Sequence, residues 1–186
     1  MRKDFGQKTW FYPMPVLLIG TYDENGKADV MNAAWGGVYD TNLVMVCLSP
    51  EHRTTANMRA RKAFTISFAD ARHVTQADYV GLVSANDEPR KLELSGFQAV
   101  PSSKVDAPLL ADLPMTLECS LVKINEDGVA IGRIENISVD EAVLGTDGKI
   151  DPEKLSPISY DAVHNEYRVL GPVVGKAFRD GLALKR

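Results

Sequence analysis

The segment from Ser49 to Asn57 holds the residue types best suited to binding an anion. Arg53 presents a planar fork of N–H donors, and Thr54 and Thr55 place two hydroxyls beside it. The run leaves a predicted strand and enters a predicted helix, whose first backbone N–H groups lack intrahelical acceptors and lie at the positive end of the helix dipole. These features predict an anion site. A second interpretation stays open at this point, in which Thr54 or Thr55 caps the helix and Arg53 is a solvated charge.

Another candidate site consists of Asn32, Ala33, Ala34 and Trp35, at the end of a predicted strand that two glycines stop. Small side chains at this position allow a flat ligand to lie against the backbone, and the Trp35 indole could stack on it. The alternative is an ordinary barrel strand that ends in a core tryptophan.

Lys91 is the third candidate. It follows a predicted helix and stands next to Arg90 in a polar segment. A lysine in this position is either a surface charge, which is the usual case, or a second phosphate ligand. The neighbouring residues do not decide between the two.

Other chemistries find little support in the sequence. His52, His73 and His164 have no ligand spacing with carboxylates or cysteines, so a catalytic metal is not expected. The chain has no G-x-S-x-G elbow, no Walker loop and no G-x-G-x-x-G. Cys47 and Cys119 lie in apolar alternating runs without CxxC spacing, and they are predicted to be buried free thiols with no redox role.

Composition narrows the class of protein further. The 186 residues are 45% apolar and 25% charged, which excludes disordered and low-complexity classes and predicts one domain over residues 1–186. A net charge of −4 and a pI near 5.4 argue against nucleic acid as a partner. No apolar run is long enough to span a membrane, the N-terminus lacks a secretory signal, and the free cysteines indicate a reducing compartment. We therefore expect a cytoplasmic protein without membrane contact.

The elements that must position the candidate residues are mostly strands. Alternating or continuous apolar runs predict strands that are joined by hairpin turns, among them the turn at Asn25-Gly26. Helical spacing and charge predict two helices, and Gly132 is expected to mark a β-bulge. The region between 86 and 108 is predicted to be irregular, with Phe97 and Val100 anchored in the core. The predicted strands cover 15–22, 30–35, 42–48 (buried on both faces), 64–68, 115–121, 129–139 and 158–169; the helices cover 55–62 and 74–85, and a last helical turn covers 175–178.

Taken together, these elements predict a mainly β protein, a closed antiparallel barrel with helices over its ends. The order of the motifs is more informative than any one of them. The chain resembles the flavin reductase-like, FMN-binding split-barrel family, and it is most similar to the flavoredoxin branch. That resemblance implies a split barrel of antiparallel Greek-key type and covers roughly residues 15–181. Its motifs are the opening Pro15–Ile19, Asn32-x-x-Trp35, Ser49-Pro50 with Arg53-Thr-Thr-x-Asn57, Phe64-x-Ile-x-Phe68, Val83-Ser84-Ala85 to Lys91, and Ile131-Gly132-Arg133-Ile134.

The resemblance also implies roles for individual residues. It places the isoalloxazine ring of FMN along Asn32, Ala33, Ala34 and Trp35. It places the phosphate and ribityl chain at Ser49, Arg53, Thr54, Thr55 and Lys91. The sequence departs from the family pattern at Ala85, which replaces Gly, and at Arg90, which replaces Asp. Residues 124–139 also lack the histidine that some relatives carry near the flavin, which puts a histidine-assisted step in doubt.

The function implied by the resemblance is that of an FMN-binding oxidoreductase. Such a protein would reduce its flavin with NADH or NADPH and pass the electrons on, and it would form a homodimer. The flavin itself carries the redox chemistry, so no catalytic side chain is assigned. The alternative is a flavoredoxin-type electron carrier with permanently bound FMN, a redox protein partner and no nicotinamide activity. A flavin-free binding or structural dimer is a third interpretation.

Overall fold

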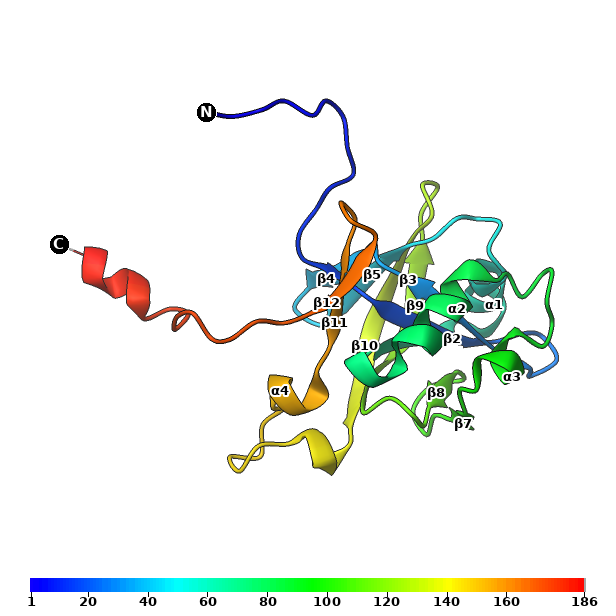
Figure 1. Cartoon of the computed structure of the whole chain (residues 1–186). Coiled ribbons are helices and arrows are strands. Elements are labelled where there is room, and N and C mark those ends of the chain that lie inside the picture. Colours follow the sequence, from blue (N-terminus) through cyan, green and yellow to red (C-terminus); the bar gives the residue numbers. More distant parts are fainter. Residues whose placement is uncertain (186) are drawn as a thin grey trace.

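Seven strands form one curled antiparallel sheet in the computed structural model, which describes residues 1–185 (Figure 1). The strand order is β3-β2-β6-β9-β10-β5-β4, so hairpin partners lie together and longer connections bring β2 beside β6 and β10 beside β5. The predicted mainly β fold with flanking helices is confirmed. Within the described residues β3 and β4 are the two edges of this sheet. The strands are β2 (Leu17–Tyr22), β3 (Ala28–Ala33), β4 (Gly36–Asp40), β5 (Leu43–Cys47), β6 (Ala63–Phe68), β9 (Met115–Ile124) and β10 (Val129–Val139).

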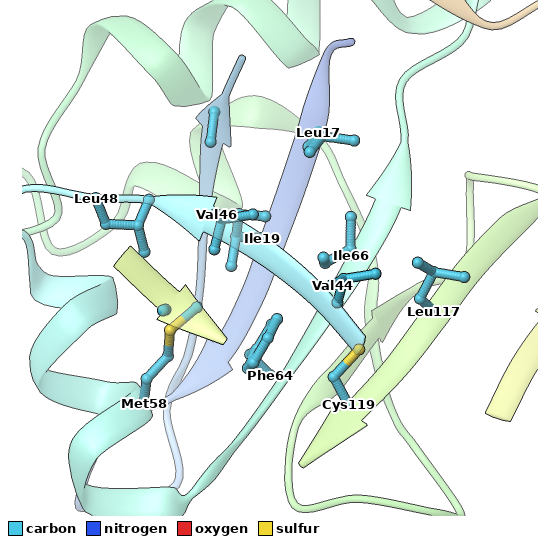
Figure 2. Packing of buried hydrophobic residues seen from close by; sticks show 12 residues of the cluster. Leu17, Ile19, Val44, Val46, Leu48, Met58, Phe64, Ile66, Leu117 and Cys119 are labelled. Atoms are coloured by element: carbon cyan, nitrogen blue, oxygen red, sulfur yellow. The ribbon is translucent and has the colours of Figure 1, made fainter. Parts of the chain in front are cut away.

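Alternation along the strands produces two cores, one on each face of the sheet. Leu17 and Ile19 of β2 point into the barrel, whereas Val16 and Leu18 point to the opposite side, under helix α2 (Val74–Leu82). Figure 2 shows the inner core, where Phe64 lies among side chains from the strands of the sheet and from helix α1 (Arg53–Arg61). Full burial of these side chains is the main stabilising contribution to the fold. The inner core comprises Leu17, Ile19, Ala33, Val44, Val46, Leu48, Met58, Phe64, Ile66, Leu117, Cys119 and Ala130.

The predicted hairpin at Asn25-Gly26 is confirmed, and Asp23 explains its geometry. The Asp23 carboxylate accepts hydrogen bonds from the backbone N–H groups of Asn25 (2.9 Å) and Lys27 (2.8 Å). Gly26 takes a positive φ of 80°, which glycine adopts at little cost. The turn thereby fixes the start of β3, the strand that carries several candidate site residues.

Several predicted boundaries are wrong. Helix α1 begins at Arg53, so Thr54 and Thr55 lie inside the helix and neither is its cap; the N-cap is His52. Helix α2 ends at Leu82, three residues before the predicted end. The two glycines after Trp35 do not end a strand, because β3 ends at Ala33 and Gly36 starts β4. The missing Cβ of Gly36 leaves room for Leu17 and for the Met45 carbonyl.

The strand at 42–48 is not buried on both faces. In β5, Val44 and Val46 are buried, whereas Leu43, Met45 and Cys47 are half-buried. The second face of β5 therefore borders a cavity rather than a core, as described below.

The region between 86 and 108 is more ordered than predicted. It contains the short helix α3 (Lys91–Ser95), and β7 (Ala99–Pro101) pairs with β8 (Pro108–Leu110). Phe97 is buried as predicted, but Val100 is exposed. Two local features stabilise α3. The Ser95 hydroxyl donates to the Leu92 carbonyl, and Gly96 ends the helix in a left-handed conformation.

The C-terminal part also differs in detail. The predicted strand at 158–169 is a hairpin of β11 (Ile158–Asp161) and β12 (Glu166–Val169), which forms a small sheet with β1 (Met14–Pro15). Beyond it the chain leaves the body (Figure 1), and its helical turn lies at Asp180–Leu184 rather than at 175–178. A fourth short helix, α4 (Pro152–Leu155), precedes this hairpin. None of the helices in residues 1–185 is long and apolar enough to cross a membrane.

Gly132 in β10 offers a test of the inner core. The predicted bulge is present as a register shift between Ile131 and Gly132. A Cβ at this position would lie 2.3 Å from Cζ of the buried Phe64 ring. We expect Gly132→Ala to lower the free energy of unfolding in urea by about 1–3 kcal/mol, because the ring must move in a packed core. The control is Gly37→Ala on the edge strand β4, where the added methyl meets no described atom within 4 Å; its effect should stay within about 0.5 kcal/mol. Equal stability of the two variants would contradict this account of the bulge.

Candidate functional site

A cavity of about 150 Å³ lies where β3, the start of α1, the end of α2 and the start of α3 meet. It brings together Arg53, Thr54 and Lys91, three of the predicted site residues. Lys91 is far from Arg53 and Thr54 in the sequence, and the fold makes it their neighbour. The lining residues are Asp29, Met31, His52, Arg53, Thr54, Val80, Gly81, Leu82, Val83, Ser84, Ala85 and Lys91.

Lys91 is not a surface charge. Its residue is 3% exposed, and its Nζ lies 3.7 Å from Oδ1 of Asp29. Burial lowers the pKa of Lys91, and the charge of Asp29 opposes that shift. At 3.7 Å the contact between Nζ and Asp29 is longer than a normal hydrogen bond. An ammonium has three donors, so a buried one that is held by a single long ion pair is suited to an anionic ligand.

Asp29 is the partner of Lys91 and was not predicted from the sequence. It is 6% exposed, and its Oδ2 accepts a hydrogen bond from the Thr54 hydroxyl at 3.3 Å. Among residues 1–185, Asp29 Oδ1 is the one buried side-chain polar atom without a hydrogen-bond partner. Such atoms are rare in folded proteins and call for an explanation.

The first turn of α1 adds further donors. The Arg53 guanidinium is half-exposed, with Nη2 4.0 Å from Oδ2 of Asp23. Within the described chain, the backbone N–H groups of Arg53 and Thr54 have no acceptor, and the His52 side chain does not cap the helix. These N–H groups are therefore free to bind an anion at the positive end of the helix dipole.

Thr55 and Ser49 lie outside this cavity. Thr55 is fully buried, and its hydroxyl donates to the Ser49 carbonyl at 2.7 Å. The Ser49 hydroxyl accepts from the Glu51 N–H at 3.4 Å. Both side chains stabilise the turn that leads into α1. They do not line the cavity, and they affect it only by holding this turn in place.

A second cavity of about 420 Å³ lies farther along β3 and shares Gly81 and Leu82 with the first. Asn32 and Ala34 line it. The Asn32 amide donates to the Ala77 carbonyl at 2.9 Å, and a Cβ on Gly81 would lie 3.0 Å from the Asn32 Cβ. This close approach of α2 to β3 fixes the distance between the two walls. The remaining lining residues are Val16, Asp78, Tyr160, Asn165 and Tyr167, and the Tyr167 hydroxyl donates to Asp78 Oδ1 at 2.7 Å.

A third cavity of about 500 Å³ follows and shares Ala34 with the second. Trp35 lines it and is 58% exposed, so Trp35 is not a core residue. Ala33, in contrast, is buried in the inner core. Half-buried Cys47 also lines this cavity, which corrects the prediction that its thiol is buried. Cys119 is buried as predicted, and burial raises the pKa of its thiol to about 12.

The three cavities adjoin and together form one groove, because the first two share Gly81 and Leu82 and the last two share Ala34. The first two lie along β3, and the third lies beyond the end of β3, at Trp35. The extended part from Asp29 to Ala33 spans about 13 Å. In the described residues the outer backbone groups of β3 have no strand partner, so they can hydrogen-bond to a ligand. The groove therefore suits a long ligand with an anionic group at the Lys91 end and a flat apolar group at the Trp35 end.

Two of the three histidines have structural partners. His73 Nδ1 lies 2.8 Å from Asp70, and His164 Nδ1 lies 2.9 Å from Asp161. No group of three or more His, Cys, Asp or Glu side chains within residues 1–185 is arranged to hold a metal ion.

Comparison with known proteins identifies the family. Residues 9–160 match the model of the flavin reductase-like domain, and the chain belongs to this family. This membership indicates a flavin-related redox function and confirms the predicted resemblance.

Two solved structures show the same split-barrel fold. A flavoredoxin of Desulfovibrio vulgaris (Miyazaki F) is 36% identical, with a TM-score of 0.93 over 97% of this chain and 100% of the other. A flavoredoxin from Methanosarcina acetivorans is 26% identical, with a TM-score of 0.89 over 99% of this chain and 100% of the other. An uncharacterized protein of Aeropyrum pernix is 28% identical over 63% of this chain, but the match spans 45% of that protein's own length.

Proposed function

We propose that the chain binds FMN noncovalently in the groove along β3 and transfers electrons through it. One observation carries this proposal: the buried Lys91 ammonium and the free N–H groups of Arg53 and Thr54 converge at one end of a groove that leads to Trp35. The similarity to two flavoredoxins supports it. FMN has the matching shape, with a phosphate at one end and a flat ring system at the other.

The proposed roles follow the groove. Lys91, Arg53 and Thr54 hold the phosphate, whereas Ser49 and Thr55 keep the first turn of α1 in place. At the other end, the ring lies along the last residues of β3 and the two residues that follow it. When bound, FMN supplies the capacity to accept and release electrons. The protein's own residues bind it, orient it and exclude water, and no side chain is assigned as a general acid or base. The residues proposed at the ring are Asn32, Ala33, Ala34 and Trp35, with Ala33 acting through its backbone.

The phosphate end of the groove gives a first prediction. Lys91→Met keeps the apolar stem and removes the ammonium. The dissociation constant of FMN should rise about 10- to 150-fold, because a charge-assisted hydrogen bond contributes about 1.5–3 kcal/mol. Riboflavin, which lacks the phosphate, should bind the two proteins about equally. Fluorescence titration measures both constants. Equal weakening of both ligands would show that Lys91 supports the fold instead, and no change in either would remove it from the site.

We further propose that NADH or NADPH supplies the electrons. The two flavoredoxin structures favour a second candidate, an electron carrier with permanently bound FMN that exchanges electrons with a redox protein partner. The two functions use the same groove and differ in the electron donor.

Anaerobic addition of a reduced nicotinamide separates the two functions. If the protein is a reductase, stoichiometric NADH or NADPH should bleach the visible absorption band of its flavin on the time scale of a stopped-flow experiment. The control is dithionite, which must bleach the band in either case. A flavin that dithionite bleaches and both nicotinamides leave unchanged would establish the carrier.

We propose that the working form is a homodimer of this chain, in the cytoplasm, with residues 1–186 acting as one domain. The terminal segments support the dimer. Both leave the body in Figure 1, and the C-terminal one places its apolar side chains in solvent, with Val173, Val174 and Phe178 exposed by 90%, 97% and 99%. Apolar side chains arranged in this way are typical of an interface. The free thiols are typical of a reducing compartment.

Light scattering tests the dimer. At micromolar concentration the protein should have about twice the mass of one 20.4 kDa chain. Replacing Val173, Val174 and Phe178 together with Ser should shift the mass toward the monomer, since these side chains would lose their apolar partner surface. Leu94→Ser removes an exposed apolar side chain from α3 and serves as the control that leaves the mass unchanged. A wild-type monomer that binds FMN tightly would contradict the dimer.

A further inference from the structure

Asp29 is a carboxylate inside the cavity assigned to a phosphate. Five charged side chains surround this end of the groove: Lys91 lies 3.7 Å from Asp29, Arg53 lies 4.0 Å from Asp23, and Lys27 lines the adjoining cavity with them. Their formal charges sum to +1. A phosphate monoester that enters as a dianion would therefore leave a net charge of −1 beside two buried charged groups, Lys91 and Asp29, which is costly in a low-dielectric environment.

The surroundings of the Asp29 carboxyl group point to how this cost is avoided. Its Oδ2 accepts the Thr54 hydroxyl at 3.3 Å, whereas Oδ1 accepts no hydrogen bond from residues 1–185 and has the Lys91 ammonium 3.7 Å away. An ionised Oδ1 can only accept hydrogen bonds, and a phosphate dianion offers none. A protonated Oδ1 would instead donate to a phosphate oxygen. One proton thus satisfies the buried atom and removes one negative charge.

We infer that binding of the FMN phosphate takes up one proton from solvent, which is held between Asp29 Oδ1 and a phosphate oxygen. This inference rests on the proposed function and adds a regulation to it: the affinity for FMN depends on pH, and that for riboflavin does not. Asp29 thereby makes the site selective for a phosphate monoester in its singly charged form.

The charged groups on the elements packed around Asp29 set the balance between its ionised and its protonated form. Lys91 from α3 and Arg53 from α1 favour the ionised carboxylate, and Asp23 from the β2–β3 turn opposes it. Lys27, also from that turn, lines the adjoining cavity with Asp29 and adds a third positive charge, and its Nζ donates to the Pro89 carbonyl at 2.5 Å. His52 at the start of α1 also lines the cavity. It is a second place where a proton could be taken up, so the experiment must exclude it.

The expected magnitude follows from the second pKa of a phosphate monoester, which is about 6. Free FMN is largely singly charged at pH 5 and largely doubly charged at pH 7. Proton uptake on binding should therefore rise from about 0.1 per FMN at pH 5 to about 0.9 at pH 7. For the same reason, the affinity of the protein for FMN should fall about tenfold per pH unit above pH 6.

Isothermal titration calorimetry of the full chain with FMN, in two buffers of different ionisation enthalpy at pH 7, measures the uptake directly. We expect about 0.9 proton for the wild type and below about 0.3 for Asp29→Asn, which can donate through its amide without a proton. Asp29→Asn should also bind FMN at least tenfold more tightly at pH 8. Glu51→Gln, which removes an exposed charge near the start of α1, and His52→Gln should both keep the wild-type uptake.

Each outcome decides. Wild-type binding of FMN without proton uptake, or with the same pH dependence as riboflavin, overturns the inference and leaves the proposed function standing. Loss of uptake in His52→Gln with full uptake in Asp29→Asn also overturns it, because the proton then lies on the histidine. Absence of FMN binding in the wild type contradicts the proposed function itself. The wild-type comparison of FMN with riboflavin between pH 5 and 8 tests the inference even if Asp29→Asn does not fold.

Discussion

The contact between the Lys91 ammonium and the Asp29 carboxylate sets the geometry of the whole groove. It joins α3 to β3, and the Thr54 hydroxyl extends it to the first turn of α1. Three elements that are distant in sequence thus meet around two buried charges. A buried ion pair contributes little net stability, because its desolvation offsets its attraction. Its value here is positional: it holds a cation, a carboxylate and a helix N-terminus around one small cavity.

The open edge of the sheet provides the rest of the groove. Because β3 pairs with β2 and has no second strand partner in the described chain, its outer backbone groups are free of strand pairing, while α2 covers the face of β3 that carries Val30 and Asn32. Gly81 lets α2 approach the Asn32 side chain closely, and the Asn32 amide ties the two elements together. The same constraint that leaves an edge strand unpaired, normally a liability, here creates a surface for a ligand.

The sequence predicted the strands well where one face is apolar and the other polar. In β9, for example, Leu117 and Cys119 point into the core as their alternation requires. It failed where tertiary contacts override local preference. Thr54 and Thr55 resemble helix caps, yet the Asp29 carboxylate and the Ser49 carbonyl take their hydroxyls, so the helix begins earlier. Trp35 resembles a core residue, yet the chain turns there toward β4 and leaves the indole exposed.

Asp29 shows why the candidate site could be predicted only in part. An aspartate two residues after a hairpin turn has no local signal that separates it from a solvated turn residue. Its burial depends on Lys91, which lies 62 residues later and is itself indistinguishable from a surface lysine in sequence. Each charge makes sense only beside the other, and the fold alone brings them together. Residue types therefore identified the cations that attract an anion, whereas the carboxylate that tempers this attraction required the structure.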